Sequence, residues 1–173
     1  MTEAHMPDER PPRTIRMFPD YACSVLWIRD PINYLKSGLS TGLVAELQAW
    51  EQSYYDSLND EIDWVSDAAA RAFTEEGVRL ARLVSAEVGP QFVVRFSSYE
   101  TGAETVYSRA EQATENSNAE SAFTSLFDEV DEDDRRIAEP VRSSPDGGWL
   151  AYAPLSDTVF TPNRQTENAP EED

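Results

Sequence analysis

Residues 66–96 read SDAAARAFTEEGVRLARLVSAEVGPQFVVRF, and this stretch decides the fold. A helix is predicted to begin at Ser66 or Asp67, because either side chain can cap the free N–H groups of a first turn. Apolar residues then recur every three or four positions, which places them on one face of an α-helix. Gly77 lies in this stripe and costs a helix interior about 1 kcal/mol relative to alanine, so we expect a close packing contact there. The stripe consists of Ala70, Phe73, Gly77, Leu80, Val84 and Val88.

The end of the same stretch predicts a strand. Gly89-Pro90 is a strong stop signal for the helix. In residues 91–96 large apolar side chains alternate with Val93 and Arg95, which is typical of a β-strand with one buried face.

Before this stretch, a second amphipathic helix is predicted from Ser40 to about Asn59. Residues 14–18 form a predicted short strand, and residues 22–28 form a second strand or an irregular buried segment. The sequence therefore predicts an α+β fold, a small sheet with two amphipathic helices packed on one face. The apolar stripe of the second helix consists of Leu43, Leu47, Trp50, Tyr54 and Leu58.

The composition divides the chain into three parts. Residues 1–13 have the composition of a disordered leader, residues 14–100 form the predicted core domain, and residues 101–173 form a largely disordered acidic extension. The extension carries 17 acidic and 5 basic residues. Within it, a helix is predicted at about residues 119–138, where apolar side chains recur at helical spacing.

The net charge restricts the partners. The chain has 33 acidic and 14 basic residues and a formal net charge of −19. Such a surface repels phosphate backbones, so direct nucleic-acid binding is not expected, whereas a basic protein partner is favoured. The alternative is that the charge only reflects an acidic proteome. The chain has no apolar run of about 18 residues and no signal-peptide pattern, so we expect a cytoplasmic protein that does not bind membranes.

Most catalytic centres are excluded by composition. His5 is the only histidine and Cys23 the only cysteine, so neither a histidine-based nucleophilic centre nor a Cys/His zinc site is expected. No phosphate-binding glycine motif is present, and the acidic run at residues 128–134 fits no calcium-loop register. We predict no catalytic residue, cofactor or metal, which favours a protein that is not an enzyme.

Two groups of residues are candidate binding sites. Asp20 and Tyr21, with Trp27, form a predicted surface patch; the alternative is that Trp27 and Cys23 belong to the core and that Asp20 makes a turn. The predicted helix in the extension has the spacing of a helix that docks its apolar face in a groove, or that packs back on its own domain. Its predicted partner-binding residues are Phe123, Leu126, Phe127, Val130, Asp128, Glu129, Asp131, Glu132, Asp133 and Asp134.

Three segments carry a family resemblance: PDYACSVLW (19–27), LSTGLVAELQAWE (39–51) and FTEEGVRLARLVSAEVGP (73–90). Together they resemble an uncharacterised family of small acidic actinobacterial proteins with a D-Y-G-C-x-x-L-W-like motif. Ala22 stands where that motif has glycine. The resemblance covers about residues 14–100 and implies a bacterial cytoplasmic setting, but no catalytic residue.

These observations favour a non-enzymatic acidic protein that binds a basic protein partner, as bacterial immunity proteins and other inhibitors do. One alternative is a DNA mimic that inhibits a nucleic-acid-binding enzyme. The other is a small enzyme that works with carboxylates alone.

Overall fold

The computed structural model describes residues 12–142, 151–153 and 158–160. The chain divides into two compact units, Met1–Phe127 and Asp128–Asp173, and each is described by itself. Nearly all of the predicted leader lies outside the described residues.

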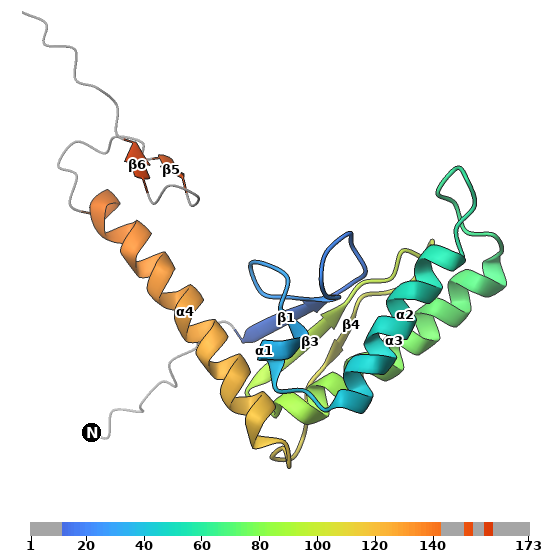
Figure 1. The fold of residues 1–173 in the computed structure, drawn as a ribbon, viewed down its shortest axis with the longest axis horizontal. Coiled ribbons are helices and arrows are strands. Elements are labelled where there is room, and N and C mark those ends of the chain that lie inside the picture. Colours follow the sequence, from blue (N-terminus) through green and yellow to red (C-terminus); the bar gives the residue numbers. More distant parts are fainter. Residues whose placement is uncertain (1–11, 143–150, 154–157, 161–173) are drawn as a thin grey trace, which may run out of the picture. The chain divides into compact units, whose positions relative to one another are not determined.

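The first unit is built on a four-stranded mixed sheet (Figure 1). Its strands are β1 (Arg13–Met17), β2 (Leu26–Trp27), β3 (Phe92–Phe96) and β4 (Val106–Ser108), in the order β2-β1-β3-β4. The two central strands β1 and β3 are parallel, and each edge strand is antiparallel to its neighbour. The sequence patterns predicted β1 and β3, and placed β2 inside an apolar run, but gave no indication of β4.

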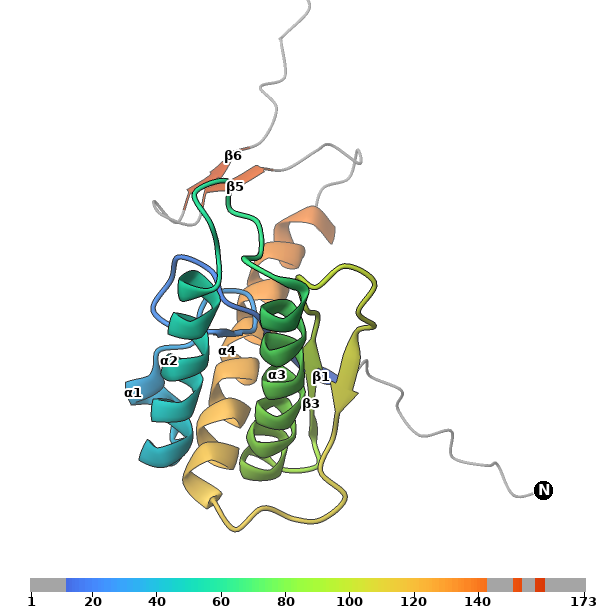
Figure 2. The same ribbon diagram turned by 90° about the vertical axis from the view of Figure 1, so that its right-hand side faces the viewer.

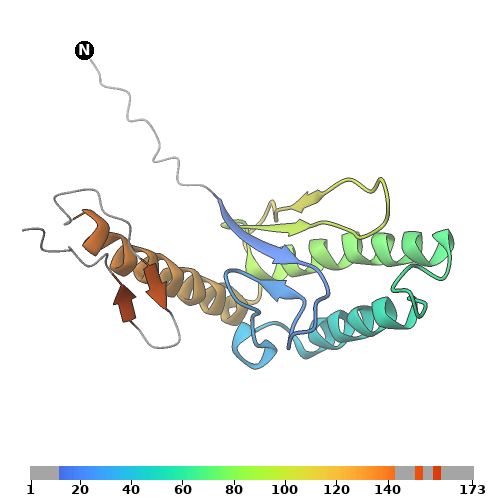
Figure 3. The same cartoon turned by 90° about the horizontal axis from the view of Figure 1, so that it is seen from above.

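Four helices are described: α1 (Tyr34–Ser37), α2 (Thr41–Asp56), α3 (Asp67–Val88) and α4 (Ser117–Arg142). The predicted starts of α2 and α3 are confirmed, because the Ser40 and Ser66 hydroxyl groups accept hydrogen bonds from the first turns of these helices. Helices α2 and α3 lie side by side (Figure 2). They cover one face of the sheet (Figure 3), so the predicted α+β architecture is confirmed.

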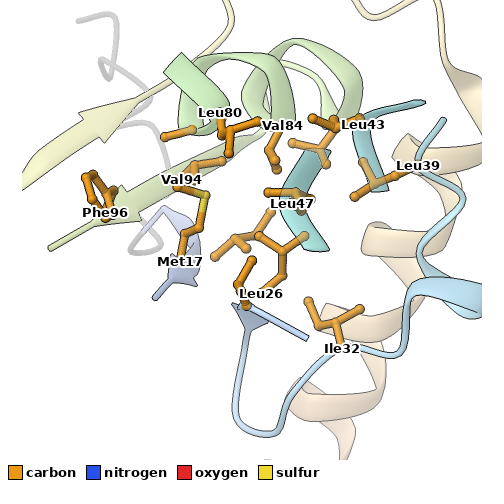
Figure 4. Close-up of a cluster of buried hydrophobic side chains, with 14 of the residues drawn as sticks. Met17, Leu26, Ile32, Leu39, Leu43, Leu47, Leu80, Val84, Val94 and Phe96 are labelled. Atoms are coloured by element: carbon orange, nitrogen blue, oxygen red, sulfur yellow. The ribbon is translucent and has the colours of Figure 1, made fainter. Parts of the chain in front are cut away.

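The core lies between this sheet and the helices. Figure 4 shows side chains of β1, β2, β3, α2 and α3 meeting in one cluster. Because side chains of a strand alternate between its two faces, Ile15 and Met17 of β1 face the helices, as do Phe92, Val94 and Phe96 of β3.

Gly77 of α3 makes the close packing contact that the sequence predicted. A Cβ atom at this position would lie 2.8 Å from Cζ2 of Trp50 and 2.7 Å from Cε1 of Phe96. These distances are too short for two carbon atoms, so glycine is required for α3 to approach the two rings.

The first unit extends beyond residue 100 because the start of α4 belongs to its core. The predicted helix at residues 119–138 is confirmed by α4. However, the rings of Phe123 and Phe127 pack against Phe92, with centroid separations of 6.0 and 5.5 Å. The apolar stripe of α4 therefore packs back on its own domain, which removes two large rings from water.

The second unit contains the rest of α4 from Asp128, and the antiparallel pair β5 (Ala151–Ala153) and β6 (Thr158–Phe160). Residues 143–150, 154–157 and 161–173 of the predicted disordered extension lie outside the described ones. In the part of the chain that is described, every helix is too short or too polar to cross a bilayer.

Candidate functional site

Three loops meet at one end of the first unit, where the parallel strands β1 and β3 reach their carboxyl ends. They are the β1–β2 loop (18–25), the α2–α3 loop (57–66) and the β3–β4 loop (97–105). Figure 3 shows the α2–α3 and β3–β4 loops at the same end of the sheet. Carboxyl ends of parallel strands are a common location for binding residues, because the loops there converge.

Aromatic side chains hold the three loops together. The ring of Tyr54 lies 5.3 Å from that of Tyr99 and 5.5 Å from that of Trp64. The indole N–H of Trp64 donates a hydrogen bond to the backbone carbonyl oxygen of Tyr99, at 3.3 Å. On the other side, the Tyr21 and Tyr55 rings lie 5.3 Å apart and join the β1–β2 loop to α2. The loops therefore form one continuous surface.

This surface is acidic throughout. We call residues 18–25, 56–67 and 97–105 the acidic loop surface. These three segments contain one, five and two acidic side chains, and they contain no lysine, arginine or histidine. A cationic partner would therefore meet no like charge on these loops. The eight acids are Asp20, Asp56, Asp60, Glu61, Asp63, Asp67, Glu100 and Glu104.

The α2–α3 loop is ordered and locally strained. The Asn59 side-chain oxygen accepts hydrogen bonds from the backbone N–H groups of Glu61 and Asp63, at 2.9 and 3.0 Å. Ile62 has a φ of 65° and is 69% exposed. A left-handed conformation is unfavourable for a β-branched residue and costs on the order of 1–3 kcal/mol. Such strain is typical of binding sites, and here it holds an apolar side chain in solvent among carboxylates.

A cavity of about 470 Å³ lies between the β1–β2 loop and α2. Glu51 lines it and is half-buried, and burial raises the pKa of its carboxyl group. The Tyr55 hydroxyl is shielded from solvent and has no hydrogen-bond partner among the described residues. Burial, followed by the nearby charge of Glu51, raises the pKa of Tyr55 to about 12. The lining residues are Asp20, Tyr21, Ala22, Gln48, Glu51, Gln52 and Tyr55.

The acidic loop surface is suited to binding cationic side chains. Carboxylates accept hydrogen bonds from arginine and lysine, and tyrosine faces attract the same cations. The carboxylate-enzyme alternative, in contrast, needs two buried acids in a pocket. Among the described residues, the buried polar side chains are all serines: Ser24, Ser37, Ser85 and Ser108.

The structure separates the residues of the predicted surface patch. Asp20 and Tyr21 lie together on the cavity, and Tyr21 is 88% exposed. Trp27 does not line this cavity. It stacks on Phe18, with ring centroids 5.2 Å apart, and its neighbour Leu26 faces the core, so Trp27 lies on the opposite face of the sheet.

The predicted docking helix is also divided. A docking face requires exposed apolar side chains, but Phe123 is fully buried, Phe127 is 7% exposed and Leu126 packs against the same core. These three positions therefore cannot serve as exposed anchors while α4 stays packed. The candidate acidic residues of α4 are exposed except for Asp133, which is half-buried, and their role in partner binding stays a prediction. They are Asp128, Glu129, Asp131, Glu132, Asp133 and Asp134.

The sequence does contain a signal for the acidic loop surface, which is the absence of basic residues over long stretches. The spacing of apolar residues does not reveal it. No basic residue occurs between Lys36 and Arg71, or between Arg95 and Arg109. These base-free stretches include two of the three loops. Recognising them as one surface requires the fold, because the loops are far apart along the chain.

The sequence model of a family described as Serratia CdiI immunity protein-like matches residues 13–99, about half of the chain. The chain belongs to this family. The matched span starts at the first residue of β1 and ends at Tyr99, so it includes most of the acidic loop surface and excludes α4. It is nearly the span of the resemblance to the actinobacterial proteins. A search of the curated proteins gives no match.

Proposed function

We propose that this member of the CdiI immunity protein-like family binds and inhibits the toxin domain of a CdiA protein. CdiI immunity proteins bind the CdiA toxin domains that are cognate to them, and they are typically cytoplasmic. The observation that carries the proposal is the family match over residues 13–99, which covers strands β1 to β3 and helices α1 to α3 of the first unit. The acidic composition agrees with it, since a basic toxin domain is a suitable partner.

The acidic loop surface is the proposed contact with the toxin domain. Eight carboxylates on loops that carry no basic side chain of their own would accelerate association with a basic face. Tyr21, Ile62 and Val65 would supply the apolar anchors, since they are 88%, 69% and 58% exposed. Interfaces gain most of their affinity from a few such side chains surrounded by polar contacts. Most of this surface lies within the matched residues, whereas α4 lies outside them, which supports this surface over α4.

Growth rescue tests inhibition. The candidate toxin domain is taken from a CdiA-type gene next to the gene for this chain and is expressed in a bacterial host, where it arrests growth. We expect co-expression of this chain to restore growth, and the two purified proteins to elute as one complex. Restored growth must disappear when the toxin domain is exchanged for an unrelated one. Arrested growth and separate elution with the neighbouring toxin domain would contradict the proposed function.

Salt dependence separates this proposal from a DNA mimic. A DNA mimic offers rows of carboxylates to a phosphate-binding groove, so its binding collapses between low and physiological salt. For an interface with apolar anchors, the same increase in salt mainly lowers the association rate constant and changes the dissociation rate constant little. We therefore expect the complex to survive physiological salt with a similar dissociation rate.

A further inference from the structure

The face of the sheet opposite the helices carries one row of side chains, with one from each strand. Arg16 of β1 lies in register with Trp27 of β2. It also lies in register with Arg95 of β3, which in turn pairs with Tyr107 of β4. The next residue in β1, Met17, faces the core, so this row faces away from α2 and α3.

The two arginines of this row are direct neighbours with no acidic partner among the described residues. Like charges opposite each other on adjacent strands destabilise a sheet. In contrast, Arg79 forms ion pairs with Glu46 and Glu76. In a chain with 33 acids, an unneutralised arginine pair in the centre of a sheet face therefore requires an explanation.

The arginine pair lines a small cavity of about 190 Å³. Arg16 is held in place, because its Nη2 atom donates a hydrogen bond to the carbonyl oxygen of Ile28 at 3.1 Å and its guanidinium lies 5.7 Å from the Phe18 ring centroid. A guanidinium has five N–H donors, so most of those of Arg16 remain available. The lining residues are Arg16, Met17, Phe18, Arg95, Ser97 and Tyr99.

We propose that Arg16 and Arg95 form a binding site for the phosphate group of a small ligand. A phosphate dianion neutralises both arginines at once, whereas a carboxylate neutralises one. Each guanidinium presents a planar fork of donors that matches phosphate oxygens. Ser97 adds a hydroxyl group to the cavity, and Tyr107, 64% exposed beside Arg95, offers a flat surface for an aromatic part of the ligand.

Phosphate binding is measured on the full-length protein by NMR, with inorganic phosphate added at constant ionic strength. We expect saturable shifts of the backbone amide signals of Arg16, Arg95 and Ser97, with a dissociation constant on the order of millimolar. Arg95→Gln should weaken binding about tenfold, the loss expected for one charge-assisted contact. The matched control is Arg82→Gln, which removes an exposed arginine of α3 and should change the affinity less than about twofold.

Thermal unfolding provides a second readout that does not depend on signal assignment. Phosphate stabilises proteins in general by exclusion from their surfaces, so only the difference between variants counts. Phosphate should raise the Tm of the wild type and of Arg82→Gln more than that of Arg95→Gln. Arg95→Gln itself should fold normally, because it removes a like-charge contact.

Two further ligands identify the chemistry of the site. Acetate at the same ionic strength should bind more weakly than phosphate. AMP that binds more tightly than phosphate would support a nucleotide ligand that stacks on Tyr107, and equal binding would support recognition of the phosphate group alone. Unsaturable shifts, equal binding by Arg95→Gln, or equal affinity for acetate would each overturn the proposal. None of these outcomes depends on the proposed toxin partner.

Discussion

The hydroxyl group of Tyr99 donates a hydrogen bond to the backbone carbonyl oxygen of Pro19, at 3.1 Å. This contact joins the β3–β4 loop to the β1–β2 loop, which lies eighty residues earlier in the chain. The Tyr99 ring also contacts Tyr54 of α2, and its carbonyl oxygen accepts a hydrogen bond from Trp64 of the α2–α3 loop. Tyr99 is therefore the one residue in these contacts that reaches all three segments of the acidic loop surface.

Replacing Tyr99 with phenylalanine removes this hydrogen bond and keeps the ring. We expect Tyr99→Phe to lower the free energy of unfolding by about 0.5–1.5 kcal/mol. It should also weaken toxin-domain binding severalfold, because the loops would be less rigidly placed. The control is Tyr107→Phe, whose hydroxyl has no partner among the described residues and which should unfold like the wild type in urea. Equal stability of the two variants would contradict the proposed role of the Tyr99 hydroxyl.

The strained backbone at Ile62 makes an unusual stability prediction. At most loop positions a glycine variant is less stable than the alanine variant, because glycine loses more backbone freedom on folding. At Ile62, where φ is 65°, alanine keeps the Cβ clash and glycine removes it. We therefore expect Ile62→Gly to be more stable than Ile62→Ala by about 1 kcal/mol in urea unfolding. Both should bind the toxin domain more weakly, since both lose the exposed side chain. A less stable glycine variant would show that the loop is unstrained.

The packing of α4 on the first unit is tested at Phe123. This side chain is fully buried, so Phe123→Ala should lower the free energy of unfolding by about 3–5 kcal/mol. The control is Leu35→Ala, which truncates a side chain that is 95% exposed and should change stability by less than about 0.5 kcal/mol. A docking helix that is free of its own domain would instead make Phe123→Ala nearly neutral for stability.

The pH dependence of stability tests the environment of Tyr55. Its pKa is about 12 in the folded protein and about 10 when it is exposed, so the folded state binds the proton more tightly. The resulting stability is fully present below about pH 10 and is lost as the pH rises through about 12. Burial also raises the pKa of Tyr34, Tyr54 and Tyr99, which contribute in the same direction.

We therefore expect Tyr55→Phe to reduce, without removing, the loss of stability between about pH 10 and 12. The measurement is urea unfolding at a series of pH values in this range, with Tyr107→Phe as the control. Identical pH profiles of Tyr55→Phe and the wild type would show that Tyr55 is not responsible for the loss.

Local patterns in the sequence predicted strands β1 and β3 and helices α2, α3 and α4. The caps at Ser40 and Ser66, the apolar stripes and the Gly89-Pro90 stop each act within a few residues, so they are readable without the structure. Strand β4 was missed because its three residues, Val106–Ser108, lie between polar segments and gain their order by pairing with β3.

The candidate site was predictable only in part. Asp20 and Tyr21 were identified from their own segment, but their neighbours Glu51 and Tyr55 come from a different element, and only the fold brings these residues together. The stripe of α4 posed a different problem. An amphipathic helix has the same spacing whether it docks on a partner or on its own core, so Phe123 and Phe127 could not be assigned to either from the pattern alone.

The most direct test compares two sets of three charge-neutralising substitutions in toxin-domain binding. One set, Asp60→Asn, Glu61→Gln and Asp63→Asn, removes three charges from the α2–α3 loop. The matched set, Glu129→Gln, Asp131→Asn and Glu132→Gln, removes three exposed charges from α4. We expect the loop set to reduce the association rate constant by about tenfold or more at low salt, and the α4 set to reduce it by less than about threefold. The reverse ranking would contradict binding through the acidic loop surface and would assign it to α4.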